Sequence, residues 1–227
     1  VISENHGLLA SSRDIIIQGD GSAKPFGLEQ EVAWNYGLNF TQTFRLAFRE
    51  GTFTVDFYRT DFVNQIVVDM DQSPQQAVFY NLDGKSYSNS FQAQLDYELI
   101  RRLDVRLAYR WLDVKTTYDG TLRTKPLLAS HRAFFNAGYE TRNHWKFDAT
   151  LNWQGEKRIP FTQSNPEEYQ LETRSPSFLL VNAQITKVWQ EKLEVYTGVE
   201  NLLNFRQDNP ILASEQPFSD YFDSSLV

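Results

Sequence analysis

The feature that most restricts the fold of this chain is a long alternation of apolar and polar residues. From Trp34 to Phe48 every second residue is apolar or aromatic, and only Gln42 interrupts the row. Side chains of a strand alternate between two faces, whereas those of an α-helix repeat every 3.6 residues. The segment is therefore predicted to be a strand, about three times as long as an ordinary one.

The alternation recurs along most of the chain. After the first segment, which starts at Val32, we find seven more, at residues 53–68, 85–99, 105–111, 133–139, 145–154, 179–185 and 193–199. The segment at 53–68 is expected to shift phase near Tyr58 and to continue to Val68. We therefore expect eight strands between residues 32 and 203.

The connections between these segments alternate in length. Tight turns are expected near Glu50-Gly51, Arg101-Arg102, Arg142-Asn143 and Gln190-Glu191. The long connections are residues 69–84, 119–128, 155–175 and 204–220, and they hold most of the prolines. Short turns at one end and long loops at the other are typical of an outer-membrane barrel, with turns in the periplasm and loops outside the cell.

Composition excludes several other classes of protein. Aromatic residues make up 15% of the chain, which argues against disorder. The net charge is −7 and no basic run is present, so nucleic acid is not expected as a partner. The absence of cysteine excludes disulfides and thiolate metal sites. No apolar stretch approaches the ~18 residues that a membrane helix needs.

A soluble β-sandwich also shows alternation, and three features argue against it here. Several strands exceed the ~9–11 residues that a membrane strand needs. The polar faces consist of Asn, Gln, Ser, Thr, Asp and Arg, as expected of a wet lumen. Trp145 and Trp153 lie at the two ends of one apolar face, as in the aromatic girdles of membrane barrels. We predict an all-β fold, an antiparallel transmembrane β-barrel segment in contact with lipid of the bacterial outer membrane.

The sequence offers few residues for catalysis, so no enzyme, metal site or cofactor is expected. His6, His131 and His144 are far apart and lack metal spacing, and a girdle or rim position suits the last two. Asp69 and Asp71 hint at calcium, but a calcium site needs six or more oxygens. We interpret these two acids, and the pair Glu167-Glu168, as solvated loop residues.

Ligand binding would use the long loops and the upper lumen of the barrel. Arginine suits anionic chelates, and aromatic rings suit sugars or catecholates. The candidates are Tyr80, Tyr118, Arg158, Tyr169, Arg174 and Arg206. For each of them, packing of loop against loop is the competing interpretation.

Two short motifs resemble a known family. The segment from Gly198 to Asn204, which includes Asn201 and Leu202, is similar to the penultimate-strand signature of TonB-dependent receptors, and residues 205–210 are similar to the last extracellular loop of receptors from the Bacteroidetes. Residues 29–38 resemble the start of a barrel strand in that family, with Gln30 in place of the usual proline, and residues 57–62 resemble the strand that follows.

This resemblance implies a 22-stranded barrel with an N-terminal plug and a short box that contacts TonB. Such receptors import iron-siderophores, cobalamin, other metal chelates or oligosaccharides with energy from the TonB complex, so a small-molecule ligand is the implied partner. We expect the sequence to be a fragment, without the plug, the TonB box or the closing strand. All of residues 1–227 would then belong to one barrel domain.

Within that domain, residues 1–31 are expected to be mostly extracellular loop, with a short strand at Asp14–Gln18, and residues 204–227 to be the last extracellular loop. Two other functions stay open at this point. Eight strands can close into a small passive barrel, an anchor or adhesin. A soluble extracellular β-sandwich that binds a ligand is the third possibility.

Overall fold

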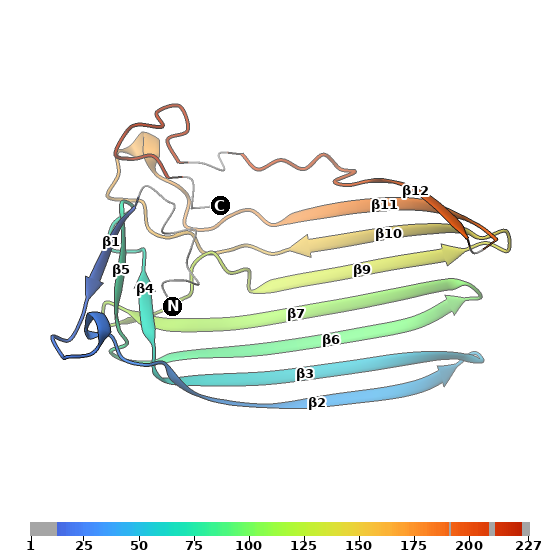
Figure 1. Cartoon of the computed structure of the whole chain (residues 1–227), viewed down its shortest axis with the longest axis horizontal. Coiled ribbons are helices and arrows are strands. Elements are labelled where there is room, and N and C mark those ends of the chain that lie inside the picture. Colours follow the sequence, from blue (N-terminus) through green and yellow to red (C-terminus); the bar gives the residue numbers. More distant parts are fainter. Residues whose placement is uncertain (1–12, 191, 209–211, 224–227) are drawn as a thin grey trace.

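A computed structural model describes residues 13–190, 192–208 and 212–223 of the protein. Eight long strands form one antiparallel sheet, and each pairs with the next along the chain (Figure 1). They are β2(Val32–Leu46), β3(Arg49–Asn64), β6(Ser86–Ile100), β7(Leu103–Tyr118), β9(His131–Glu140), β10(Trp145–Gln154), β11(Phe178–Trp189) and β12(Leu193–Val199). The short strand β8(Thr121–Thr124) pairs with the end of β7. The eight predicted strands are thus confirmed, and we call this sheet the wall.

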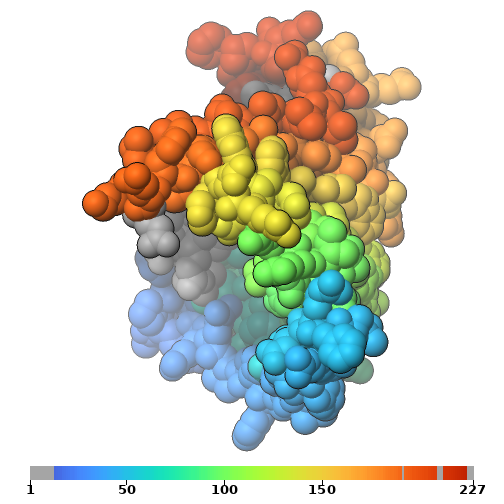
Figure 2. Space-filling view, turned by 90° about the vertical axis from the view of Figure 1, so that its right-hand side faces the viewer, coloured from blue at the N-terminus to red at the C-terminus, as the bar shows by residue number. Residues whose placement is uncertain are grey.

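The wall is an open, bent sheet. Within the described part of the chain, β2 pairs only with β3, and β12 pairs only with β11. All the short turns lie at one end of the wall and the long connections lie at the other (Figure 1). Seen from the turn end, the turns follow a bent path rather than a straight line (Figure 2).

The turn between β2 and β3 lies at Ala47-Phe48, so the prediction of a turn near Glu50-Gly51 was wrong. Both turn residues have positive φ, 49° and 62°, as a two-residue hairpin of mirror-image type requires. Asn-Gly is the usual sequence for such a turn, and its absence left no local signal. The first strand ends at Leu46, and Phe48 is 93% exposed at the tip of the turn.

The strand register separates one apolar and one polar face of the wall. One row across six strands consists of Phe53, Leu95, Leu107, Phe135, Leu151 and Val181. A row of the opposite face consists of Thr52, Asp96, Arg106, Asn136, Thr150 and Asn182. The apolar face is widely exposed. Leu38, Phe40 and Leu107 are among its large side chains that remain exposed.

A second, three-stranded sheet lies at the long-connection end (Figure 1). Its strands are β1(Asp14–Gln18), β5(Gln76–Asn81) and β4(Ile66–Asp69), in the order β1-β5-β4, and β1 pairs with β5 in parallel. The predicted strand at 14–18 is confirmed. The prediction for the second wall strand was wrong in two respects: it ends at Asn64 instead of Val68, and its register runs without a shift past Tyr58. The loops predicted at 69–84 and 119–128 contain β5 and β8.

This small sheet holds many of the most deeply buried apolar residues of the described chain. Val67, Ala77, Val78 and Phe79 are all at most 2% exposed. Their burial explains why β4 leaves the wall: in the wall, its valines would lose these apolar contacts. We call the small sheet, together with residues 119–130, 155–177 and 212–223, the loop layer.

Two short 3-10 helices, at Pro25–Gly27 and Glu167–Tyr169, complete the secondary structure of the described residues. No helix in this part of the chain has the length and apolar character needed to cross a bilayer. The expectations for residues 1–12 and 224–227, including His6, lie outside the described residues.

Candidate functional site

The loop layer covers the polar face of the wall at the long-connection end. Ser86, Leu112 and Thr116 belong to this face, and all three are less than 9% exposed. The hydroxyl groups of Ser86 and Thr116 lie 2.9 Å apart. Because these positions would face the lumen of a barrel, the loop layer lies over the mouth of that lumen.

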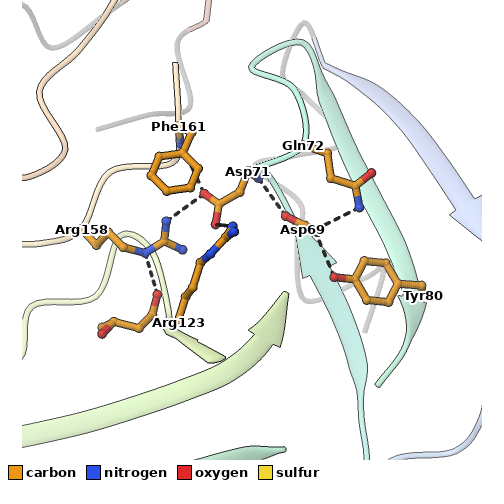
Figure 3. Close-up of polar contacts among 8 residues, drawn as sticks. Asp69, Asp71, Gln72, Tyr80, Arg123, Arg158 and Phe161 are labelled. Atoms are coloured by element: carbon orange, nitrogen blue, oxygen red, sulfur yellow. Dashed lines mark hydrogen bonds and ion pairs between the residues drawn. The ribbon is translucent and has the colours of Figure 1, made fainter. Parts of the chain in front are cut away.

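Asp71 holds the loop layer together (Figure 3). Its Oδ1 accepts hydrogen bonds from Arg158 Nη1 at 2.8 Å and from the backbone N–H of Phe161 at 3.3 Å. Its Oδ2 lies 3.7 Å from Arg123 Nη1. The side chain of Asp71 is 3% exposed and that of Arg158 is 15% exposed. The cluster therefore joins three long connections through one nearly buried carboxylate.

Aromatic rings and a backbone carbonyl complete the surroundings of Arg158. Its Nε donates to the carbonyl oxygen of Thr124 at 2.6 Å. Its guanidinium carbon lies 5.8 Å from the ring centre of Tyr118 and 5.7 Å from that of Phe161. These contacts offset part of the cost of burying a cation, and Arg158 Nη2 stays buried without a hydrogen-bond partner.

Asp69 anchors the same region from β4 (Figure 3). It accepts hydrogen bonds from the N–H of Asp71 at 2.8 Å, from Gln72 Nε2 at 3.0 Å and from the Tyr80 hydroxyl at 3.0 Å. Burial, together with the charge of Asp69, raises the pKa of Tyr80 well above its ordinary value. Tyr80 therefore stays protonated and keeps donating to Asp69 at any physiological pH.

The interpretation of Asp69 and Asp71 as solvated loop acids was wrong. Asp69 is 1% exposed, and Asp71 is paired with an arginine 87 residues further along the chain. A partner so distant in sequence leaves no local pattern. Glu167 and Glu168 are exposed, as predicted.

The structure brings together three of the six predicted ligand-binding residues. Tyr118, at the end of β7, is buried, whereas Tyr80 and Arg158 are partly buried. Tyr80 contacts Asp69, Tyr118 contacts Arg158, and Arg158 contacts Asp71. Tyr80 also lines a hollow of about 360 Å³.

The side chains of the other three candidates lie outside this cluster, although the backbone of Arg174 pairs with that of Arg158. Tyr169 stacks on Tyr221, with ring centres 5.2 Å apart, and Arg174 forms an exposed ion pair with Glu156 at 3.4 Å. Arg206 is exposed in the connection after β12. These three side chains remain accessible to a ligand.

Sequence reasoning missed a buried ion pair that joins the two ends of the described chain. Arg13 Nε donates to Asp223 Oδ2 at 2.6 Å, and the two side chains are 1% and 3% exposed. Arg13 Nη1 also donates to the carbonyl oxygen of Gln76 in β5. The pair fixes the C-terminal segment to the small sheet, but neither residue stands in a motif.

Below the loop layer, the polar face of the wall is open. Near the turn end it borders a hollow of about 770 Å³ whose charged lining includes Glu50, Glu98 and Asp104 and the ion pair between Arg106 and Asp96 at 2.5 Å. Among the described residues, no three His, Asp or Glu side chains are grouped so that they could hold a metal ion.

The two described histidines lie at opposite ends of the wall. His131 begins β9, and its Nδ1 lies 2.7 Å from the Tyr109 hydroxyl. His144 lies in the turn before β10, with Nδ1 3.4 Å from Glu140. The girdle or rim position expected for both histidines stays a prediction.

The motif at 198–204 forms the end of β12. Asn201 has a φ of 51°, and its side chain donates to the carbonyl oxygen of Phe205 and accepts from the N–H of Phe205, at 2.8 and 2.9 Å. Asparagine suits this role because it tolerates the left-handed region and bonds locally. The N–H of Leu202 donates to the Val181 carbonyl at 2.7 Å.

Gly198 and Asn204, the other two motif residues, lie where the backbone geometry favours these residue types. A Cβ on Gly198 would lie 3.1 Å from the carbonyl oxygen of Ala183. The N–H of Asn204 donates to the carbonyl oxygen of Asn201 at 2.8 Å, and Asn204 has a φ of 52°. The motif therefore builds a turn, and Phe205 then stacks on Phe178 with ring centres 4.8 Å apart.

Comparisons with known proteins agree with this geometry. A family model described as a TonB-dependent receptor-like β-barrel matches residues 6–202. The comparison with curated proteins gave no match.

Three solved structures illustrate the similarity in fold. The ferric-catecholate import receptor Fiu of E. coli is 15% identical with a TM-score of 0.61, over 92% of this chain and 28% of that one. The ferric enterobactin receptor PfeA of Pseudomonas aeruginosa is 13% identical with a TM-score of 0.55, over 80% and 27%. FpvA of P. aeruginosa, solved with a pyoverdine and iron, is 14% identical with a TM-score of 0.56, over 78% and 24%. The chain thus spans about a quarter of the length of these structures.

Proposed function

Because the chain belongs to the TonB-dependent receptor-like β-barrel family, we propose that it forms part of the wall of a receptor that actively imports a metal chelate. Its strands are those of a bacterial outer-membrane barrel. The observation that carries the proposal is the division of the wall into a lipid-facing apolar face and a polar face, whose mouth the loop layer covers. Such a wall suits a water-filled lumen with a gated opening.

An iron chelate is the solute class that the comparisons favour. Fiu is described as a ferric-catecholate import receptor and PfeA as a ferric enterobactin receptor, and FpvA was solved with a pyoverdine and iron. Cobalamin and oligosaccharides remain the alternative solutes. At the loop surface, we propose Tyr169, Arg174 and Arg206 as the first contacts of the solute, since the other three candidates are engaged inside the loop layer.

The other two functions have less support. A passive eight-stranded barrel needs its first and last strands to pair, and β2 and β12 have no such pairing in the described residues. A sandwich needs two large sheets packed face to face, whereas the second sheet here has only three short strands at one end of the wall.

Uptake by cells that carry the full-length protein tests the proposal. Radioactive iron would be supplied as a ferric catecholate, as ferric citrate or as ferric pyoverdine, and cobalamin would be tested in parallel. We expect uptake of one chelate that falls to background when either the receptor gene or TonB is deleted. Uptake that persists without TonB would contradict active import and support a passive barrel.

A further inference from the structure

Two arginines lie side by side on the polar face of the wall. Arg110 of β7 is the direct register partner of Arg132 of β9. Directly opposed residues of an antiparallel pair have Cβ atoms about 4.5–5.5 Å apart, and like charges at that spacing repel. A sheet that keeps two cations in this position has a local electrostatic cost, which an anion would remove.

Neither arginine is neutralised by the chain itself. In the part of the chain that the structure describes, no hydrogen bond, ion pair or ring contact involves the side chain of Arg110 or Arg132, and both residues are exposed. Arg106 offers a direct comparison, because it lies on the same face of β7 and pairs with Asp96 at 2.5 Å. This face can therefore neutralise an arginine, but it does not do so for Arg110 and Arg132.

The neighbours in the same row do not supply a negative charge either. Gln92 opposes Arg110 from β6, and Gln154 opposes Arg132 from β10. The nearest acid of the row is Asp56, one strand beyond Gln92, where it accepts a hydrogen bond from Asn39 at 2.5 Å. With about 4.8 Å between neighbouring strands, Asp56 lies roughly 10 Å from the Arg110 backbone.

The pair lines a hollow of about 310 Å³ on this face. Gln92, Asn152 and Gln154 contribute amide groups to its lining, and Phe134, Phe178 and Leu180 contribute apolar surface. Guanidinium groups bind carboxylate through two parallel hydrogen bonds each. The hollow is thus lined by two guanidinium groups, neutral amide donors and apolar side chains.

We propose that Arg110 and Arg132 form a subsite for a carboxylate-rich anion, the carboxylate-bearing part of the imported solute. This assignment rests on the import function proposed above and adds to it a position inside the lumen, below the loop layer. A solute that has passed the loop layer would meet the arginine pair next. Its carboxylates would replace the repulsion between the two cations with charge-assisted hydrogen bonds.

Calorimetric titration of the purified full-length receptor with citrate, at low ionic strength, tests the subsite. We expect Arg110→Gln and Arg132→Gln each to weaken citrate binding about tenfold, and the double variant to abolish measurable binding. A double Arg→Lys variant should bind citrate more weakly than the wild type but better than the double Gln variant. The ammonium group keeps the charge but cannot donate two parallel hydrogen bonds to one carboxylate. Arg106→Gln is the matched control and should bind citrate as the wild type does.

The thermal unfolding midpoint of the same variants separates a solute site from an internal contact. If an acidic segment of the full-length protein neutralised the arginines, the double Gln variant would unfold at a lower temperature and the wild type would not bind citrate. That result, or equal citrate binding by the wild type and the double variant, would overturn the proposal. TonB-dependent uptake by the wild type tests the import function separately. The arginine subsite and the import function can therefore be refuted independently.

Discussion

Replacing Asp71 with asparagine is expected to destabilise the loop layer by about 3–5 kcal/mol, since removal of one partner leaves a buried charge uncompensated. Arg158 and Arg123 would both lose their carboxylate, and Arg158 is only 15% exposed. The wall should stay intact, because its ladders do not involve these side chains. The expected result is thus a receptor with a folded barrel and an unfolded loop layer.

Hydrogen exchange on the full-length protein measures this effect. Amides of β5, in the small sheet, should exchange much faster in Asp71→Asn, while those of β6 and β7 below the layer should keep their protection. Glu156→Gln is a matched control, because it removes an exposed ion pair with Arg174, whose side chain is 71% exposed. Exposed pairs contribute about 0–1 kcal/mol, so this variant should exchange like the wild type. Equal protection of β5 in Asp71→Asn and in the control would contradict the role given to Asp71.

The second large effect is expected on the apolar face of the wall. Leu95 of β6 lies between Phe53 and Leu107 in the apolar row. An arginine that faces lipid at the middle of the bilayer costs about 2–4 kcal/mol. Leu95→Arg should therefore lower the free energy of unfolding of the barrel by this amount.

The adjacent residue provides the control for this substitution. Gln94 opposes Thr54 and Ala108 on the polar face, next to Asp96. Gln94→Arg therefore places the same charge in water, beside a carboxylate, and should leave stability within about 0.5 kcal/mol of the wild type. Denaturant unfolding of the full-length protein in lipid vesicles compares the two. Equal losses for both variants would show that the face assigned to lipid is not in lipid.

The wall could be predicted from the sequence because its pattern is local. Each strand shows its two faces through alternation, and neighbours along the chain pair with each other, so no long-range information was needed. The turn at Ala47-Phe48 was misplaced because turn residues of that kind usually include glycine or asparagine.

The loop layer could not be predicted in the same way. β1 and β5 pair in parallel across some 60 residues of chain, Asp14 with Gln76, and a parallel pair has no hairpin signal between its strands. Asp71 and Arg158 likewise come from different connections. The sequence suggested Tyr80, Tyr118 and Arg158 as ligand-binding candidates, but only the fold shows that they contact Asp69, Arg158 and Asp71.

The arginine pair illustrates a third limit. Arg110 and Arg132 stand in two alternating segments, and each looks like an ordinary polar-face residue. The two arginines lie opposite each other only because of the register between β7 and β9. These strands are joined by residues 119–130. Prediction of such a site needs the register as well as the strands.

The wall is expected to cross the outer membrane with its turns in the periplasm and its loop layer outside the cell. These 227 residues contain no cysteine, so Arg174→Cys and Phe48→Cys can each introduce one at an exposed position of the loop layer and of a turn. The full-length protein, with any cysteines elsewhere replaced, would be treated on intact cells with a maleimide that cannot cross membranes.

We predict that the cysteine at 174 is labelled on intact cells and that the one at 48 is labelled only after the outer membrane is permeabilised. Labelling at 48 on intact cells, or protection at 174 on intact cells, would contradict the assigned orientation.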